Sequence, residues 1–203
     1  MRTRLAAGLV VVVIFAAFPA AAQEFKIDPS HSSANFTVRH MLVSNVNGRF
    51  AKMSGGLYYD EKAPEKSWVK AVIDATSVNT DHPDRDNHLR SADFFEVEKH
   101  PQITFESQRV EKRGDGFVAF GTLTMKGVAK EIELPFEFLG KVKDPRGKTR
   151  VGFEATTVLN RKDYGINWSR MMDTGGAVVS DNVKINLQIE AVEAPPSPAE
   201  RSS

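Results

Sequence analysis

The sequence predicts an all-β fold. Apolar and polar residues alternate with a period of two in eight separate segments, and clusters of Gly, Pro, Asp and Asn lie between the segments. Such alternation is typical of strands with one buried and one exposed face, and the turn-rich connections favour antiparallel pairing. Eight such strands form either a β-sandwich or a closed up-and-down barrel. The segments lie at 32–40, 48–60, 67–78, 102–110, 116–125, 129–140, 149–160 and 182–192.

Each segment has a face that we expect to be buried. In the first, Ala34, Phe36 and Val38 share one face and polar residues take the other. The segment 116–125 is apolar on parts of both faces. Elsewhere the apolar faces comprise Phe50; Val69, Ala71, Ile73 and Ala75; Ile103 and Phe105; Ile132, Leu134, Phe136 and Phe138; Val151, Phe153 and Ala155; and Val183, Ile185, Leu187 and Ile189.

Local signals predict the connections between strands. Residues 114–116 and 126–127 are typical of hairpin turns. Pro135 cannot donate a hydrogen bond within a sheet, so we expect an edge or a bulge at that position. Helix is scarce in this sequence, with short pieces expected at 41–45 and 84–92.

The two ends of the chain differ from its centre. Arg2 and Arg4 precede an apolar run and a small-residue cleavage site, which predicts a signal peptide over 1–22 with cleavage after Ala22. We therefore expect export to the periplasm. The run is far shorter than the about 20 residues that span a bilayer, so no stable membrane insertion is expected. One domain is predicted over 23–192, and the Pro/Ser-rich stretch 193–203 is predicted to be disordered.

Composition excludes several classes of function. The chain has no cysteine, which rules out thiol catalysis and cysteine-ligated metal. Its charges are interleaved without a basic run, so nucleic acid is not expected as a partner. No serine-nucleophile elbow or phosphate-binding loop occurs, and we predict no catalytic residue. Asp28 with His31 is a weak candidate for a mixed metal site, and strand-end hydrogen bonds explain both residues better.

The predicted buried faces are rich in phenylalanine. The chain has 13 Phe but only 3 Tyr and 2 Trp, so most of its aromatic side chains lack a polar group. An eight-stranded barrel has room for either a packed core or one small ligand. From the residues alone, a filled core is the better interpretation.

Several segments resemble the YceI family of periplasmic, lipocalin-like polyisoprenoid-binding proteins. The resemblance runs from Ile27 to Glu190. It differs slightly at Ala129, where the family usually has Thr, and at Tyr164, where Phe is common. The matching stretches are "IDPSHSSANFTVRH", "VNGRF", "SVNTDHPDRDNHLRSADFFEVEKHPQITFES", "GTLTMKGVAKEIELPFEF", "RKDYGIN" and "VSDNVKINLQIE".

The resemblance implies an extended eight-stranded antiparallel lipocalin-like barrel with a short helical insertion. It also implies an apolar tunnel for an isoprenoid, quinone-like or fatty-acyl lipid, which reverses the preference for a filled core. A tail gains about 0.8 kcal/mol for each buried CH₂ group, so such a tunnel binds with few polar contacts. The expected partner is this small-molecule lipid, with no separate cofactor, and a homodimer is compatible with the pattern.

The stretch "RDNHLRSADFF" combines charges with paired aromatic residues. Arg85, His88 and Leu89 share a helix face by spacing. We expect Phe94 and Phe95 to plug or line the cavity, and Arg85, His88 and Arg90 to contact a lipid head group at its mouth. The alternative is a purely structural hydrogen-bond cluster of Arg85, Asp86 and His88. The full set of predicted ligand-binding residues is Phe36, Val38, Phe50, Ile73, Phe94, Phe95, Phe105, Leu123, Phe136, Phe153, Tyr164, Arg85, His88 and Arg90.

Other functions remain compatible with the same sequence. An enzyme acting on a small amphiphile would use the same cavity, but no titratable pair appears on the apolar faces. A stress-protection protein with a filled core is a further possibility, and a fatty amide or a xenobiotic would fit the same space. In "RKDYGIN" we expect Arg161 and Asp163 to pair with each other and Tyr164 to approach the cavity.

Overall fold

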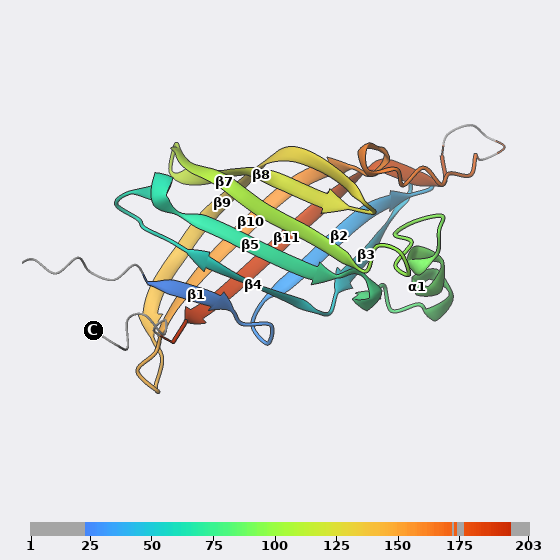
Figure 1. Cartoon of the computed structure of the whole chain (residues 1–203). Helices are drawn as coiled ribbons and strands as arrows, with labels where there is room; N and C mark the ends of the chain where they lie inside the picture. The colour runs from blue at the N-terminus through green and yellow to red at the C-terminus, as the bar shows by residue number, and fades with distance from the viewer. Residues whose placement is uncertain (1–22, 172, 174–176, 196–203) are drawn as a thin grey trace, which may run out of the picture.

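The protein is a β-barrel that carries a short α-helix at one end (Figure 1). The computed structural model describes residues 23–171, 173 and 177–195, so the predicted signal peptide and most of the predicted disordered tail lie outside the described residues. Helix α1 spans Pro83–Arg90. The strands are β1 (Glu24–Ile27), β2 (Ser33–His40), β3 (Ser44–Phe50), β4 (Met53–Tyr58), β5 (Trp68–Asp74), β6 (Val78–Asn79), β7 (Gln102–Arg113), β8 (Gly116–Met125), β9 (Val128–Lys143), β10 (Thr149–Asn160) and β11 (Val179–Glu193).

The sheet closes into a barrel of eight strand positions. Strands β1 and β2 together occupy one position, and strands β3 and β4 together occupy the next. Strands β1 and β2 both pair with the long strand β11, and their other neighbours are β4 and β3 respectively. From there the order runs β4, β5, β7, β8, β9, β10 and back to β11, with every pairing antiparallel. The closed eight-stranded antiparallel barrel confirms the predicted fold class and excludes the sandwich.

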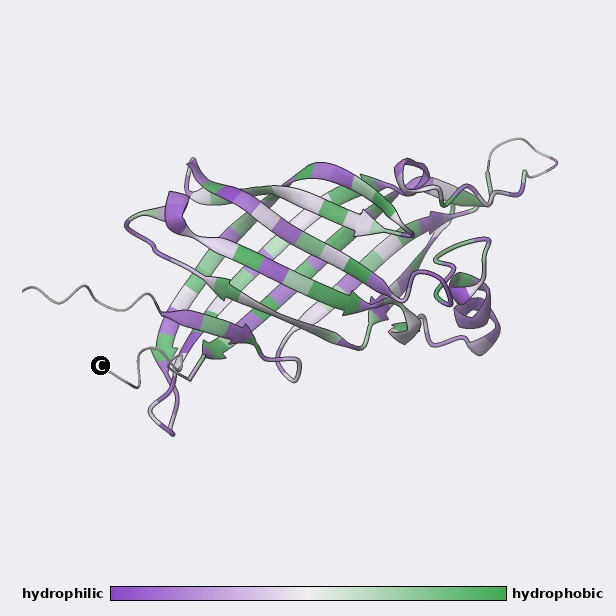
Figure 2. Cartoon of the chain, in the orientation of Figure 1, coloured by the Kyte–Doolittle hydropathy of each residue, from purple (hydrophilic) through white to green (hydrophobic). Residues whose placement is uncertain are grey.

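Alternation along the strands explains why these residues form a barrel. Figure 2 shows hydrophobic and hydrophilic residues in turn along the strands. Val69, Ala71 and Ile73 of β5 face the interior, and so do Phe153 and Ala155 of β10. Successive side chains of a strand point to opposite faces, so each strand contributes every second residue to the inside.

The hairpin between β2 and β3 corrects one prediction. Residues 41–45 were expected as a helical piece, but 41–43 form a turn and Ser44 begins β3. His40 pairs with Ser44 across this turn, and Met41 and Leu42 have positive φ angles of 50° and 60°. A left-handed backbone at two successive residues reverses the chain and cannot continue a right-handed helix.

The second predicted helix and both predicted hairpins are confirmed. Helix α1 begins at Pro83, whose fixed φ suits the first helical position, and the His82 ring accepts a hydrogen bond from the Arg85 backbone at 3.4 Å. The turn at 126–127 joins Met125 to Val128 in β8 and β9, and the turn at 114–115 joins β7 to β8. Helix α1 lies at one end of the barrel (Figure 1).

Strand β9 leaves its neighbour β10 halfway along. The pairing ends at Phe136 with Ala155, so Pro135 lies where β9 has a partner only in β8. The expected edge at Pro135 is confirmed. The register of this pair shifts between Gly152 and Phe153.

The single strand predicted over 48–60 is wrong, because Phe50 ends β3 and Met53 begins β4. Two further short strands were not predicted. Strand β1 places Phe25 and Ile27 in the core, and β6 places Val78 against Phe50. Within the described residues, no helix is both long and apolar enough to cross a membrane.

Candidate functional site

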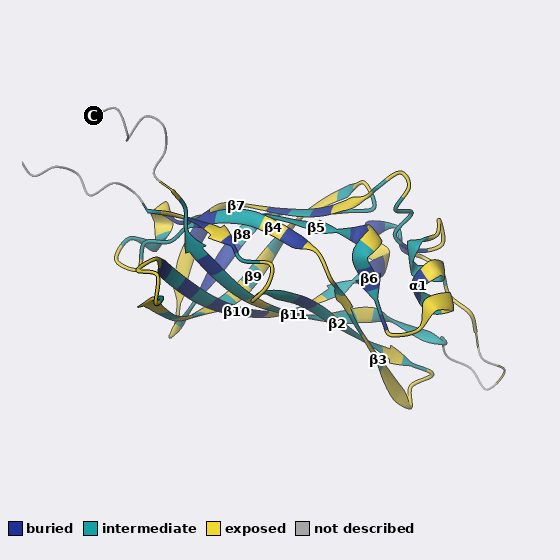
Figure 3. Ribbon diagram, turned by 90° about the horizontal axis from the view of Figure 1, so that it is seen from below, coloured by how far each residue is buried: buried dark blue, intermediate teal, exposed yellow. Residues whose placement is uncertain are grey.

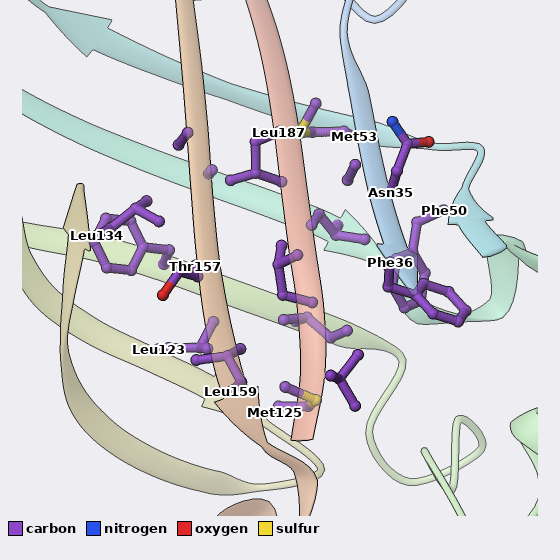
Figure 4. Close-up of a pocket in the computed structure, with 18 of the residues that line it drawn as sticks. Asn35, Phe36, Phe50, Met53, Leu123, Met125, Leu134, Thr157, Leu159 and Leu187 are labelled. Atoms are coloured by element: carbon purple, nitrogen blue, oxygen red, sulfur yellow. The ribbon is translucent and has the colours of Figure 1, made fainter. Parts of the chain in front are cut away.

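The barrel encloses a cavity of about 470 Å³, a size typical of small-molecule sites. Side chains from β2, β4, β8, β9, β10 and β11 point toward this common space (Figure 4). Those labelled include Phe36, Met53, Leu134, Leu159 and Leu187. The filled core that the residues alone had favoured is therefore absent from the described part of the chain.

The lining is mostly apolar, and its arginine and histidine side chains lie at one end. We call His40, Arg85, His88, Arg161 and Trp168 the polar end, because they bring basic and hydrogen-bonding groups to the cavity. No Asp, Glu or Lys occurs among the described residues that line it. His88 lines the cavity and its side chain is 40% exposed, so the cavity reaches solvent beside this residue.

Most of the predicted ligand-binding residues line this cavity, but Tyr164 and Arg90 do not. Tyr164 is buried in a hydrophobic cluster and does not line the cavity, and burial raises the pKa of its hydroxyl. Arg90 donates to the backbone oxygens of Thr76 and Val78 at 2.8 and 2.7 Å, which attaches α1 to the barrel. The residues that line the cavity as predicted are Phe36, Val38, Phe50, Ile73, Arg85, His88, Phe94, Phe95, Phe105, Leu123, Phe136 and Phe153.

The charged residues of α1 combine a structural role with a place at the cavity. The buried Asp86 carboxylate accepts from the backbone and the hydroxyl of Thr80 at 2.8 and 2.6 Å. Arg85 donates from Nε to the Thr80 hydroxyl and from Nη2 to the Thr80 carbonyl. These bonds form the predicted structural cluster for Arg85 and Asp86, whereas His88 bonds instead to Asp93 at 2.9 Å. The Arg85 Nη1 group donates to no protein atom within the described residues, and Arg85 lines the cavity at the polar end.

An aromatic group surrounds His88. The His88 ring meets Phe94 edge-on at 5.0 Å and Trp168 edge-on at 5.1 Å between ring centroids. Phe94 and Trp168 also contact each other at 5.4 Å. Phe95 packs against Phe50 at 5.5 Å. The paired phenylalanines therefore line the cavity as expected, while Trp168 carried no sequence signal that connected it to α1.

Arg161 is a second residue that the sequence interpretation assigned differently. It is buried, and its carboxylate partner is Asp181 at 3.2 Å instead of the expected Asp163. Its other bonds go to backbone oxygens, including those of Ile166 and Trp168 at 2.7 Å each. Burial lowers the pKa of the Arg161 guanidinium, and Asp181 opposes this effect. Arg161 thus holds the segment that carries Trp168 at the polar end.

The opposite end of the cavity is aromatic. Tyr59 lies 4.6 Å from Phe138 and 5.2 Å from Phe153 between ring centroids, and Trp68 lines the same end. Burial, with the nearby Glu61 charge adding to it, raises the pKa of Tyr59 to about 12. The Tyr59 hydroxyl is shielded from solvent and has no hydrogen-bond partner among the described residues.

A glycine fixes the position of Phe36. A Cβ on Gly48 would lie 2.2 Å from the Phe36 ring, so only glycine lets that ring rest on the neighbouring strand. Phe36 pairs with Gly48 between β2 and β3 and then lies 5.7 Å from the Phe50 ring.

Asp28 and His31 lie in an ion-pair network outside the cavity. Their ligand atoms and one of Glu190 lie within 4.8 Å of one another, as in a possible metal site. However, the Arg150 guanidinium donates to both Asp28 and Glu190, so a cation already occupies these carboxylate oxygens. The arrangement favours an ion-pair network over a metal site, and the two residues connect the β1–β2 loop to β10 and β11.

Comparisons with known proteins agree with this architecture. A UPF0312 protein of Serratia proteamaculans is 39% identical over 184 residues, which cover 90% of this chain and 93% of that protein. One of Pseudomonas paraeruginosa is 39% identical over 194 residues, which cover 95% and 98%. The crystal structure of the Campylobacter jejuni YCEI protein matches with a TM-score of 0.67 at 34% identity, covering 77% of this chain and 90% of that one.

A more distant solved structure shares the fold. It is a polyisoprenoid binding domain from Saccharophagus degradans, with a TM-score of 0.61 at 20% identity, covering 84% of this chain and 98% of that one. The family model described as the YceI-like domain matches residues 25–191, which is nearly the whole described chain. On this match and the identity to its relatives, the chain belongs to the YceI-like family.

Proposed function

We propose that this protein binds the apolar tail of an isoprenoid-type lipid inside the barrel, and that it carries or sequesters this lipid in the periplasm. The observation that carries the proposal is the cavity itself, which is mostly apolar and has its arginine and histidine side chains at one end. The name of the Saccharophagus degradans neighbour supports an isoprenoid as the class of tail. Quinone-like and fatty-acyl tails have the same apolar character.

The polar end suits an anionic or hydrogen-bond-accepting head group. Arg85 has an Nη1 group without a partner in the described residues, and His40 and His88 line the same end. Guanidinium groups bind phosphate and carboxylate oxygens well. The family match favours a binding protein over an enzyme, and no carboxylate among the described residues lines the cavity beside His40 and His88.

Both tryptophans of the chain line the cavity, which provides a test. Intrinsic fluorescence is titrated with farnesol, geranylgeraniol and solanesol. We expect affinity to rise about tenfold or more per added isoprene unit and then level off when the cavity is full. Geranylgeranyl diphosphate should bind more tightly than geranylgeraniol, and Arg85→Gln should remove that difference.

Two matched variants of β10 provide the control. Ala155→Phe adds a ring inside the cavity, whereas Val158→Phe adds the same ring on the exposed face of the same strand. The first should weaken geranylgeraniol binding, and the second should leave it unchanged, with melting temperatures measured for both. Equal binding by the two variants would contradict the proposal.

A further inference from the structure

The hairpin between β2 and β3 ends in three consecutive apolar residues that the fold leaves exposed. Met41, Leu42 and Val43 are 43%, 65% and 82% exposed, and we call them the hairpin tip. The positive φ angles of Met41 and Leu42 favour Gly, Asn or Asp at these positions. The tip therefore carries apolar side chains where both solvent and backbone conformation favour other residues.

The hairpin tip lies beside the polar end of the cavity. His40 precedes the tip and lines the cavity. The Met41 backbone donates to the carbonyl of Val178 at 2.8 Å, and Val178 also lines the cavity. Figure 3 shows the β3 hairpin and α1 at the same end of the barrel, with the exposed residues of the hairpin in yellow. Any surface that covers the tip therefore faces the opening beside His88.

Further exposed apolar and cationic side chains lie around the polar end of the cavity, which we call the rim. Met171 is 68% exposed. It follows Trp168 in the chain and forms an antiparallel bridge with Ala177. Arg39 and Arg170 are exposed and form no ion pair within the described residues. The Arg170 carbonyl accepts from the Val178 backbone at 2.8 Å, which places Arg170 on the rim. Apolar side chains flanked by cations match the interface of a bilayer with anionic head groups.

We propose that the hairpin tip inserts into the interface of a lipid bilayer and brings the polar end of the cavity against the membrane surface. This inference rests on the proposed binding of a lipid tail. A tail that moved through water to reach the cavity would expose its whole apolar surface, which the hydrophobic effect opposes. With the tip in the bilayer, the tail passes between membrane and cavity without that exposure.

The test compares two pairs of substitutions. Leu42→Asp with Val43→Asp changes the hairpin tip, and aspartate tolerates the left-handed backbone of Leu42. Leu139→Asp with Val142→Asp is the matched control. These residues of β9 are 60% and 63% exposed, and Val142 pairs with Arg150 at the opposite end of the barrel. Both pairs remove exposed apolar side chains and add the same charge.

Two sources of geranylgeraniol separate membrane docking from binding. The first is vesicles of phosphatidylcholine and phosphatidylglycerol that contain geranylgeraniol, and the second is geranylgeraniol diluted from ethanol without vesicles. We expect the tip variant to lose binding to vesicles in a flotation assay. We also expect it to acquire geranylgeraniol from vesicles at least about tenfold more slowly than the unsubstituted protein. Uptake from ethanol and the melting temperature should stay unchanged, and the control variant should behave like the unsubstituted protein.

Three outcomes would overturn the inference. Equal transfer rates from vesicles for tip and control variants would show that the tip does not dock. A dimer that the tip substitutions convert to monomer, with no vesicle binding by either form, would identify a second copy as the occupant. If the unsubstituted protein takes up no geranylgeraniol from either source, the binding function fails, and the inference fails with it.

Discussion

Tyr59 shows at the scale of one residue how the cavity wall departs from an ordinary core. Its ring packs among Phe117, Phe138 and Phe153, and its hydroxyl is buried without a partner in the described residues. A buried polar group without a hydrogen bond is destabilising, and most folded proteins avoid one. Because the hydroxyl is shielded also from the cavity, a ligand in the cavity does not satisfy it without rearrangement.

Removing this hydroxyl should stabilise the protein. We expect Tyr59→Phe to raise the free energy of unfolding by about 1 kcal/mol, since the ring stays and the unsatisfied group is lost. Urea unfolding measures the change. Tyr58→Phe is the control, because the Tyr58 hydroxyl donates to Asp60 at 3.3 Å and its loss should not stabilise. A less stable Tyr59→Phe variant would mean that the hydroxyl is hydrogen-bonded in solution.

Single residues were predictable from the sequence where the period-two pattern placed them. Phe36, Phe105 and Phe153 face the cavity because alternation alone fixes the face of each strand residue. Arg161 and Trp168 lie outside regular strands, and their places depend on bonds to distant segments. Their contribution to the polar end was therefore not readable from local spacing.

At the scale of elements, Arg150 of β10 joins three parts of the barrel. It forms ion pairs with Asp28 after β1, with Asp144 in the β9–β10 turn and with Glu190 of β11. Hydrogen bonds from Arg150 and then from His31 hold the pKa of Asp28 well below its usual range. The ionised Asp28 carboxylate thus helps to close the barrel between β1 and β11.

This network predicts an acid-sensitive contribution to stability. Because the pKa of Asp28 is lower in the folded state than the about 4 of an unfolded chain, its contribution is present above that pH. It is lost as pH falls toward the folded-state pKa. We expect Asp28→Asn to be less stable at neutral pH and to lose less stability between about pH 4 and pH 2.

Unfolding in urea across this pH range measures the effect of Asp28→Asn. Asp115→Asn, in the exposed β7–β8 turn and without an ion pair in the described residues, is the matched control and should keep the acid dependence of the unsubstituted protein. An unchanged acid dependence in Asp28→Asn would contradict this role for the network.

Elements were predicted well where turn residues or alternation identified them. The hairpins at 114–115 and 126–127 contain glycine and are correct, and α1 starts at its proline. The β2–β3 hairpin was missed because Met41, Leu42 and Val43 carry no turn signature. Strand β1 was missed because four residues give too short a pattern.

At the scale of the whole molecule, local patterns could not separate a barrel from a sandwich. Both architectures bury one face of each strand, and the difference lies in which strands pair. Closure depends on β1 pairing with β11, whose residues are far apart in sequence. The hollow interior likewise depends on how side chains from all strands meet, and only the family resemblance pointed to it.

The proposed function requires that the barrel holds one apolar tail in its cavity. The most direct measurement is native mass spectrometry of the protein isolated from the periplasm of expressing cells, followed by lipid extraction and identification. We predict one lipid per chain, with a long apolar tail, and a lipid-free Ala155→Phe variant. A lipid-free unsubstituted protein that also acquires no mass on incubation with geranylgeraniol would contradict the claim.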